Sequence, residues 1–453
     1  MEKVAPFELT QEFLERILEA IEAGDFAFIR ESLEQVRHED VSSLLEELSA
    51  DQSKLVLQLL DKDVASAVIE DLDEYTRSKF LTVFKPHEIA DYIDNIETDN
   101  AADILNELPV KVREEVIANI KSPEKASHII ELLRYDEDCA GGLMAKELIK
   151  ANVNWNVVEC VAEIRRQAEN VEKIYGVYVV DDNDTLLGRV SLKEIIIAKS
   201  NAKIADIYKS DVISIYTYQK EEEIAELIQK YDLESVPVIN VQGKLVGRIT
   251  VDDIIDVITE IADQERILMA GIAEDVEEDD SVWVLSRARL PWLIIGLIGG
   301  LTGARFIGFF EEDLLKVASL AFFIPLIIAT GGNVGIQSSA LVVQSLASIN
   351  VFESSLWQKF FKTIFVAILN GLVLAGLVYV FVYFSYDSKL AFIVGCALFT
   401  VVILASLLGT LIPLVLDKMG FNPALASGPF ITTTIDLIGL GVYFMVAHLL
   451  YQF

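Results

Sequence analysis

Apolar residues recur in a short, fixed pattern along the first 134 residues. Two adjacent apolar residues are followed by a third at position i+4, and the pattern returns every 12 residues. This spacing places the apolar side chains along one stripe of a short helix. Because helices this short do not persist alone in water, residues 1–134 are predicted to stack into an all-α superhelix. The seven copies begin at Leu44, Val56, Val68, Phe80, Tyr92, Ile104 and Val116.

A duplicated α/β pattern follows in residues 135–262. Two short apolar runs that predict a β-hairpin are followed by a helix, and the same order returns 59 residues later without a gap. An amphipathic helix precedes each hairpin, at Val158–Ala168 and Glu221–Tyr231. The sequence therefore predicts two modules, at about 135–200 and 201–262. Their strands are Val177–Val180, Leu186–Ser191, Val236–Ile239 and Leu245–Thr250.

From residue 290 onward the chain is apolar in five long stretches. Each is long enough to cross a hydrocarbon core of about 30 Å as a helix, so residues 290–453 predict an all-α membrane domain. Residues 263–289 predict a connecting helix, in which Ala262–Glu274 continues helically and acids follow at 275–280. The spans are Leu290–Phe309, Val317–Ala347, Phe361–Tyr383, Leu390–Leu416 and Pro423–Tyr451.

Basic residues at the ends of the spans predict their orientation. Five lie on one side of the membrane and two on the other, which puts the N-terminus in the cytoplasm and, after five spans, the C-terminus outside. The first residues contain no apolar signal-peptide core, in agreement with a cytoplasmic soluble part. The two sets are Arg287, Arg289, Lys359, Lys362 and Lys418 against Lys316 and Lys389.

Two of the spans carry polar residues at mid-depth. An acid there costs roughly 2.5 to 3.5 kcal/mol to insert, so Asp436 in the last span marks a candidate functional site. Gly428, Thr432 and Asp436 share one face of that helix, and Pro429 is expected to free the carbonyl of Leu425. The second span is predicted to break at Pro325 and at Gly331–Gly332, offering carbonyls to a hard cation.

Close helix packing is the alternative for the glycines of the second span, although it accounts less well for Asn333 and Gln337. A structural ion pair is the alternative for Asp436. No Lys, Arg or His lies at comparable depth in the sequence, because Arg305 falls near the outer end of the first span. A cation path is therefore the favoured interpretation.

The negative charge lies entirely before the membrane domain. Residues 286–453 hold 8 Lys+Arg and 7 Asp+Glu, which leaves 29 and 63 for residues 1–285, a net charge of −34. Such a balance excludes a basic nucleic-acid-binding surface and fits cations, a basic partner or simple solvation. The three cysteines match no zinc-site spacing.

Several acids are candidate regulatory cation ligands. In the helix after the second module, Asp252 and Asp256 stand four residues apart, and like charges at that spacing destabilise a helix unless cations offset them. The acids of the helical repeat are predicted to lie on a solvated outer face, or else to face a second acidic surface with cations between. The full set is Asp253, Asp256, Asp252, Asp232, Asp91 and Asp94, with Asp99 and Asp103 on the same outer face of the repeat.

The order of these parts resembles the MgtE family of magnesium channels, and the tandem modules resemble CBS domains. The resemblance covers nearly the whole chain. The residues that carry it are Tyr135–Met144, Thr250–Val257, Pro325 with Gly331–Ser338, and Asn422–Pro429 with Asp436.

The resemblance implies a multidomain fold: an all-α N-terminal superhelix, an α/β CBS-domain pair, a connecting (plug) helix and an all-α five-helix transmembrane domain. It implies a homodimer in the lipid of the inner, cytoplasmic membrane, and Mg²⁺ as both transported and regulatory ion. Asp436 would hold Mg²⁺ in a pore lined by Thr432, Gly428, Gly332 and Asn333. Cytosolic Mg²⁺ between acidic surfaces would close that pore, and ATP is a possible ligand of the CBS pair.

Three other functions remain open from sequence. A membrane enzyme would need a second catalytic group at depth, and neither a paired Asp nor a Ser/His set is present there, so no enzymatic activity is expected. A CBS-containing sensor would signal without transport. A divalent-cation transporter could instead carry Co²⁺, Ni²⁺ or Mn²⁺.

Overall fold

The 12-residue pattern folds into short helices at the predicted places. In a computed structural model of the chain, helices begin at residues 38, 50, 62, 74, 86, 98 and 110, a constant step of 12. The structure describes residues 9–34, 36–168, 171, 173–273, 276, 281–347, 356–426 and 428–451. The helices are α1 (Gln11–Ala23), α2 (Phe26–Leu33), α3 (His38–Glu46), α4 (Ala50–Leu59), α5 (Lys62–Asp71), α6 (Glu74–Leu81), α7 (Pro86–Ile93), α8 (Thr98–Asn106), α9 (Val110–Asn119) and α10 (Pro123–Leu132).

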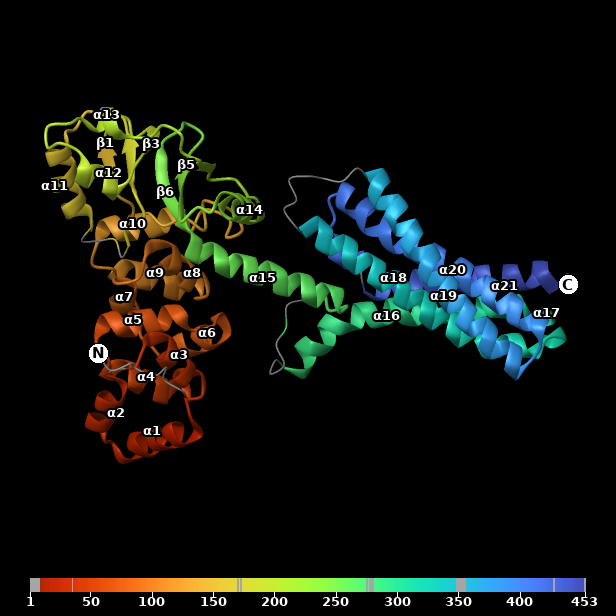
Figure 1. Ribbon diagram of the computed structural model, residues 1–453. Coiled ribbons are helices and arrows are strands. Elements are labelled where there is room, and N and C mark those ends of the chain that lie inside the picture. The colour runs from red at the N-terminus through yellow and green to blue at the C-terminus, as the bar shows by residue number, and fades with distance from the viewer. Residues whose placement is uncertain are drawn as a thin grey trace. The chain divides into compact units, whose positions relative to one another are not determined.

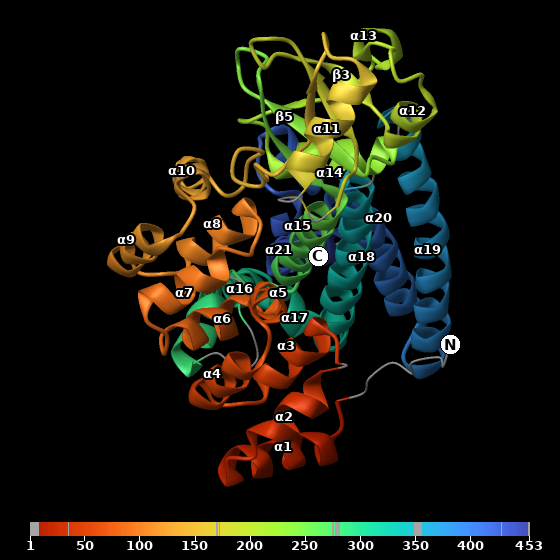
Figure 2. The ribbon, with the colours of Figure 1, turned by 90° about the vertical axis from the view of Figure 1, so that its left-hand side faces the viewer.

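These helices stack in chain order and form two rows (Figures 1 and 2). Contacts skip one helix: α3 packs on α5, α5 on α7 and α7 on α9, while α2 packs on α4, α4 on α6 and α8 on α10. The predicted apolar stripe is the core between the rows, since Leu44, Val56, Val68, Ile104 and Val116 are at most 1% exposed. The all-α superhelix is confirmed.

Two small sheets of identical topology follow. In each, the first strand pairs parallel with the second and the second pairs antiparallel with the third. The predicted hairpins are confirmed, and each sheet gains a short first strand that the pattern did not predict. The strands are β1 (Lys150–Asn152), β2 (Val177–Val180), β3 (Leu186–Val190), β4 (Ile215–Tyr216), β5 (Ser235–Ile239) and β6 (Leu245–Thr250). The helices are α11 (Val157–Gln167), α12 (Leu192–Ile197), α13 (Ile204–Ile207) and α14 (Glu221–Tyr231).

The helix after the second module, α15 (Val251–Met269), continues into the connecting segment as predicted. It ends five residues earlier than expected, because Gly271 takes a left-handed φ of 78° that stops the helix. Acids 275 and 277–280 lie outside the described residues. The chain divides into two compact units between Val257 and Ile258, and each is described by itself.

The second unit contains five helices long and apolar enough to cross a membrane, among the residues described, so the five predicted spans are confirmed. Helix α19 lies alongside α20, which also contacts α18 and α21 (Figures 1 and 2). The elements are α16 (Val282–Gly308), α17 (Glu311–Lys316), the 3₁₀ helix η2 (Ala318–Phe323), α18 (Ile324–Ala347), α19 (Leu356–Ser385), α20 (Ser388–Lys418), the 3₁₀ helix η3 (Pro423–Ala426) and α21 (Pro429–Tyr451).

The predicted break at Gly331–Gly332 is wrong. Helix α18 runs through both residues, and the backbone irregularity lies earlier, where η2 gives way to α18 next to Pro325. The glycines serve close packing instead: a Cβ on Gly331 would lie 3.0 Å from Val401 Cγ1, and one on Gly335 would lie 2.0 Å from Ile435 Cδ1. Carbonyls at this depth therefore stay in helical hydrogen bonds.

The last span also begins later than predicted. Residues Pro423–Ala426 form a separate 3₁₀ turn, and Pro429 is the first residue of α21. Proline suits that position because the first helical N–H has no partner within the helix in any case. The expectation that Pro429 frees the carbonyl of Leu425 inside a continuous helix is therefore wrong.

Candidate functional site

Asp436 lies nearer the start than the middle of α21 and faces α18. Its Oδ1 atom is buried and has no hydrogen-bond partner among the described residues. A Cβ placed on Gly332 would lie 3.6 Å from that oxygen and 3.1 Å from Thr432 Cγ2, so the α18 backbone passes directly beside the carboxylate. Buried polar atoms are normally paired, and an unpaired carboxylate oxygen is a position at which a cation can bind.

The other pore candidates lie on the same two helices. One turn before Asp436, Thr432 donates its hydroxyl hydrogen to the Gly428 carbonyl (3.1 Å). Gly428 in turn lies against the end of α15, where a Cβ would come within 2.9 Å of the Met269 carbonyl. Asn333 is exposed on α18, on the side that its own chain leaves uncovered. The predicted lining therefore divides between one half-buried carboxylate, with a buried Oδ1 atom, and an exposed polar face.

On the cytosolic side, the first turn of α15 fixes two carboxylates in different surroundings. Asp253 Oδ2 accepts hydrogen bonds from the Thr250 N–H (2.9 Å) and hydroxyl (2.7 Å), so the side chain of the third helical residue folds back onto the residue before the helix. Asp252 accepts a hydrogen bond from the Tyr175 hydroxyl (2.7 Å) and lies 3.3 Å from Lys173 Nζ. The hydrogen bond from Tyr175 holds the pKa of Asp252 below its usual range.

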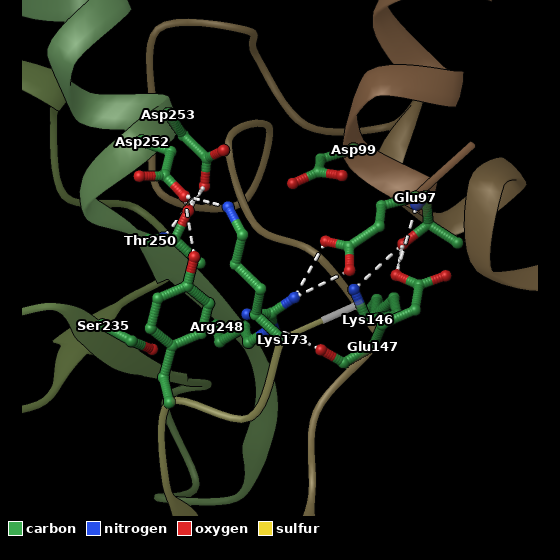
Figure 3. A network of polar contacts seen from close by, with 12 residues as sticks. Glu97, Asp99, Lys146, Glu147, Lys173, Ser235, Arg248, Thr250, Asp252 and Asp253 are labelled. Atoms are coloured by element: carbon green, nitrogen blue, oxygen red, sulfur yellow. Dashed lines mark hydrogen bonds and ion pairs between the residues drawn. The ribbon is translucent and has the colours of Figure 1, made fainter. Parts of the chain in front are cut away.

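Asp99 of α8 lies opposite Asp253 (Figure 3). The residue is 4% exposed, so its prediction as part of a solvated outer face is wrong. Burial, and then the charges of Asp253 and Glu97, raise the pKa of Asp99 well above its usual range, and burial also raises the pKa of Asp253. Two carboxylates that face each other in this way disfavour the doubly ionised state unless a cation lies between them.

A signal for Asp99 existed in the sequence. Ala101 and Ala102 are both buried in α8, so this helix is covered on two sides and not only on the side of its own row. Small residues at both positions permit that second contact. The 12-residue pattern by itself predicts only the contact of α8 within its own row of helices.

The remaining acidic candidates lie elsewhere. Asp91 is an ion-pair partner of Lys121 (2.6 Å) and Lys62 (3.3 Å), and the hydrogen bond from Lys121 lowers its pKa. Asp94 accepts the backbone N–H of Lys121 (3.1 Å). Asp232 is exposed and ends α14 in a left-handed conformation with φ 49°. Lysine side chains therefore already neutralise Asp91 and Asp94, the two acids of the helical repeat that were predicted to hold ions.

Asp256 lies one turn beyond Asp252 and Asp253 on α15. Burial, followed by the charges of Asp253 and Asp252, raises its pKa. Within the residues that the structure describes, no three His, Cys, Asp or Glu side chains gather into a closed metal site. Mg²⁺ commonly keeps several waters and takes only one or two carboxylates, so the Asp99–Asp253 pair suits Mg²⁺ better than a metal that requires a full set of ligands.

A small cleft lies between the two CBS-like sheets. Its lining includes Lys173, Tyr175, Tyr178, Ser235 and Arg248. The Tyr178 hydroxyl hydrogen-bonds Ser235 Oγ (2.7 Å) across the pair of modules. Arg248 is 3% exposed, and its Nη1 has no hydrogen-bond partner within the described part of the chain. A buried guanidinium nitrogen without a partner favours an anionic ligand in this cleft.

Three family models match consecutive parts of the chain. A model described as MgtE intracellular N domain matches residues 36–138, and the CBS domain model matches residues 140–201 and 204–260. A model described as MgtE, divalent cation transporter, matches residues 324–446. With the five apolar helices, these matches make the chain a multi-pass membrane protein with an intracellular N-terminal part.

Relatives match over most of the length of the chain. The chain is 33% identical to the magnesium transporter MgtE of Thermus thermophilus over 442 residues, which cover 96% of this chain and 97% of the relative. It is 35% identical to the magnesium transporter MgtE of Enterococcus faecalis, with 85% and 90% coverage. These alignments include the membrane domain as well as the soluble parts.

Two solved structures resemble the soluble part. One is the cytosolic domain of the Mg²⁺ channel MgtE in complex with ATP, at 32% identity and a TM-score of 0.51, covering 54% of this chain and 99% of that one. The other is the soluble part of a magnesium transporter, at 30% identity and a TM-score of 0.50, with 56% and 99% coverage. The predicted resemblance is confirmed, and the chain belongs to the MgtE family of divalent cation transporters.

Proposed function

We propose that the chain carries Mg²⁺ across the cytoplasmic membrane, along a path beside α18 and α21. The observation that carries the proposal is the buried Asp436 oxygen, which has no hydrogen-bond partner in the part of the chain that the structure describes. Relatives that are named magnesium transporters align with most of this chain, which supports Mg²⁺ as the transported ion. At an inside-negative potential, a divalent cation gains about 4.6 kcal/mol per 100 mV on entering, which favours import.

Two copies of the chain are proposed to form the pore, with the N-termini inside and the C-termini outside. Asn333 and Gln337 are exposed on α18 in the single chain. Amide side chains facing lipid at this depth would be costly, whereas a second copy or a wet pore would satisfy them. Two Asp436 carboxylates would then face one ion.

Cytosolic Mg²⁺ is proposed to close the pore from the acidic soluble part. Asp253 and Asp99 supply opposed carboxylates, and Asp252 and Asp256 add charge beside them. Helix α15 carries this site at its start, and its other end lies against Gly428 beside the first turn of α21. The proposed division of labour is sensing in residues 1–134 and 135–262, connection in 263–289 and conduction in 290–453.

ATP is proposed as a ligand of the CBS pair. A related cytosolic domain has been solved in complex with ATP. In this chain, Lys173 and Nη1 of Arg248 would meet phosphate oxygens, and Tyr175 offers an aromatic face. Bound nucleotide would modify closure, and no catalytic step is assigned to the protein.

Flux through reconstituted vesicles tests the function directly. Wild-type protein should load Mg²⁺ into liposomes that contain a fluorescent Mg²⁺ indicator, and the Asp436→Asn variant should fall to the level of empty liposomes because the neutral amide cannot offset a divalent charge. Asp417→Asn, an exposed acid at the end of α20, is the matched control and should transport normally.

The same vesicles separate the remaining alternatives. Absence of flux in the wild type would favour a sensor and sink the transport proposal. Equal flux of Co²⁺, Ni²⁺ or Mn²⁺ would show that the path carries divalent cations in general and is not selective for Mg²⁺. Retained flux in Asp436→Asn would remove Asp436 from the pore.

A further inference from the structure

We propose that Arg287 and Arg289 bind the phosphate groups of anionic phospholipids in the cytoplasmic leaflet of the membrane. The bound lipids hold the turn of α16 on which the connecting segment rests. Lipid binding is independent of the transported ion, whereas its effect on closure rests on the proposed regulation by cytosolic Mg²⁺.

Helix α16 is longer than the hydrocarbon core requires. Its 27 residues rise about 40 Å, which matches a bilayer together with its headgroup regions and exceeds the core of about 30 Å. The apolar span begins at Leu290, so residues 282–289 form about two further turns of the same helix on the cytoplasmic side. These turns therefore lie at the depth of the lipid headgroups.

One exposed stripe runs along α16 from these turns into the span. Its six positions follow one another at steps of four and three residues, so they share one face of the helix. The stripe is apolar throughout the span and ends in an arginine and a tryptophan, which is typical of a helix that faces lipid. The six exposed residues are Trp283, Arg287, Leu290, Ile294, Leu297 and Leu301.

The opposite stripe of α16 is covered by the chain itself. Ala288, Gly299 and Gly303 are its buried residues. A Cβ on Gly299 would lie 2.0 Å from Thr433 Cγ2, so α16 packs closely on α21 along this side. The two stripes fix the rotation of α16, and they leave Trp283, which is 74% exposed, on the side away from α21.

The connecting segment rests on the same cytoplasmic turn. The N–H of Ala273 donates to the Ala288 carbonyl (2.9 Å), and Ala288 is fully buried. Arg287 and Arg289 stand on either side of Ala288 in the chain, and both are exposed. Lipid phosphates held by the two guanidinium groups therefore restrain the turn to which the connecting segment is bound.

Charge favours an anionic phospholipid as the partner of this turn. A guanidinium group binds phosphate oxygens through paired N–H donors, and each arginine at the surface adds to the attraction toward an anionic membrane. No Asp or Glu occurs in residues 281–310, so α16 itself supplies no competing carboxylate. A second copy of the chain could cover the apolar stripe, but it would not supply phosphate groups to the arginines.

Fluorescence quenching of Trp283 tests the binding. Full-length protein is reconstituted into mixed phosphatidylcholine and phosphatidylglycerol, with bromine on one lipid or on the other. The difference between wild type and Trp283→Phe isolates the Trp283 signal from that of the other tryptophans. Near Trp283 of the wild type, phosphatidylglycerol should be preferred about tenfold over phosphatidylcholine, because two arginines attract it.

Charge removal should abolish this preference. In Arg287→Gln/Arg289→Gln the two lipids should quench Trp283 equally within about twofold, whereas Arg287→Lys/Arg289→Lys should keep most of the preference. Arg305→Gln, in the last turn of the same helix, is the matched control and should behave as wild type. Added inorganic phosphate should leave the wild-type preference unchanged, since a lipid is also held by its acyl chains.

Three results would overturn the inference. One is equal quenching by the two lipids in the wild type, and another is a preference that persists in the glutamine variant. The third is weak quenching by both lipids, which would show that a second copy or the acidic soluble part covers Trp283.

Inhibition by internal Mg²⁺ tests the effect on closure. In membranes that contain phosphatidylglycerol, Arg287→Gln/Arg289→Gln should need about fivefold more Mg²⁺ for half inhibition than the wild type, because its docking turn is less restrained. Equal values in the two proteins would contradict the link to closure. The quenching needs no transport, so a failure of the proposed function and a failure of the lipid site are distinguishable.

Discussion

At Asp253 a single carboxylate has two roles, one for each oxygen. Oδ2 accepts hydrogen bonds from the N–H and the hydroxyl of Thr250, which restrict the side chain, and the rest of the group stays directed toward Asp99. A helix cap is usually a purely local device. Here the same residue also presents charge to the neighbouring domain, so the sequence signal of a cap hides a possible ligand.

Loss of Asp253 and Asp256 should weaken inhibition by internal Mg²⁺. The Asp253→Ala/Asp256→Ala channel is expected to need roughly tenfold more Mg²⁺ for half inhibition, which corresponds to about 1.4 kcal/mol of lost binding free energy. Patch recordings with varied internal Mg²⁺ measure this shift. An unchanged inhibition curve would remove these acids from regulation, and Glu222→Ala, exposed in the first turn of α14, is the control.

The pH dependence of stability follows from the raised pKa values of Asp99 and Asp253. A carboxyl whose pKa is higher in the folded state binds more protons when folded, so its contribution to stability is largest below its unfolded pKa of about 3.9 and is lost as pH rises through the raised value. In EDTA, thermal unfolding should therefore shift to lower temperature as pH rises through that window.

Neutral replacement isolates this effect from other titrating groups. In Asp99→Asn the decline with pH should be shallower, and saturating Mg²⁺ should reduce the difference between variant and wild type. Parallel pH profiles of the two proteins in EDTA would show that Asp99 is ionised without penalty. That outcome would contradict the burial and opposition described for this carboxylate.

Among the helices of the membrane domain, close packing explains several of the glycines. A Cβ on Gly409 of α20 would lie 2.5 Å from the Gly335 carbonyl oxygen of α18, and 3.0 Å from Ser338 Cβ. A backbone atom cannot move aside as a flexible side-chain end can. The contact between α18 and α20 therefore depends on Gly409.

Gly409→Ala should consequently destabilise the membrane domain. Overpacking typically costs about 1 to 3 kcal/mol, and displacement of α18 should also reduce Mg²⁺ flux. Thermal unfolding in detergent and liposome uptake measure the two effects. Gly376→Ala on α19 is the matched control, since a Cβ there would meet no atom within 4 Å, and equal behaviour of the two variants would refute the packing argument.

The spacing of apolar side chains predicts the helices of the repeat and the two hairpins well, because the conformation of each element depends mainly on its own residues. The seven copies of the 12-residue pattern and the two hairpins follow directly from side-chain spacing. Asp99 could not be placed in this way, because its burial depends on a domain that lies later in the chain. The prediction of a helix break at Gly331–Gly332 is wrong for a related reason. Glycine permits both a helix break and close packing, and only the neighbouring helices decide between them.

For the whole molecule, the net charge of −34 before residue 286 should act at long range. It should raise the local concentration of Mg²⁺ around the acids proposed to regulate closure, and salt screens this effect over a Debye length of about 10 Å at 0.1 M. Half inhibition should therefore require more internal Mg²⁺ in 0.5 M than in 0.1 M monovalent salt. Patch recordings at the two salt levels, with osmolality balanced by sucrose, measure the shift, and its absence would confine regulation to local contacts.

The constant helix step in the N-terminal region also limits how its length can change over evolution. Helices contact their second neighbours, so adjacent repeats belong to opposite rows. Insertion or loss of twelve codons would move every later helix into the other row and turn α8 away from the CBS pair. Insertion or loss of two repeats together would leave each helix in its row and preserve that contact, so domains of this kind should differ in length by pairs of repeats.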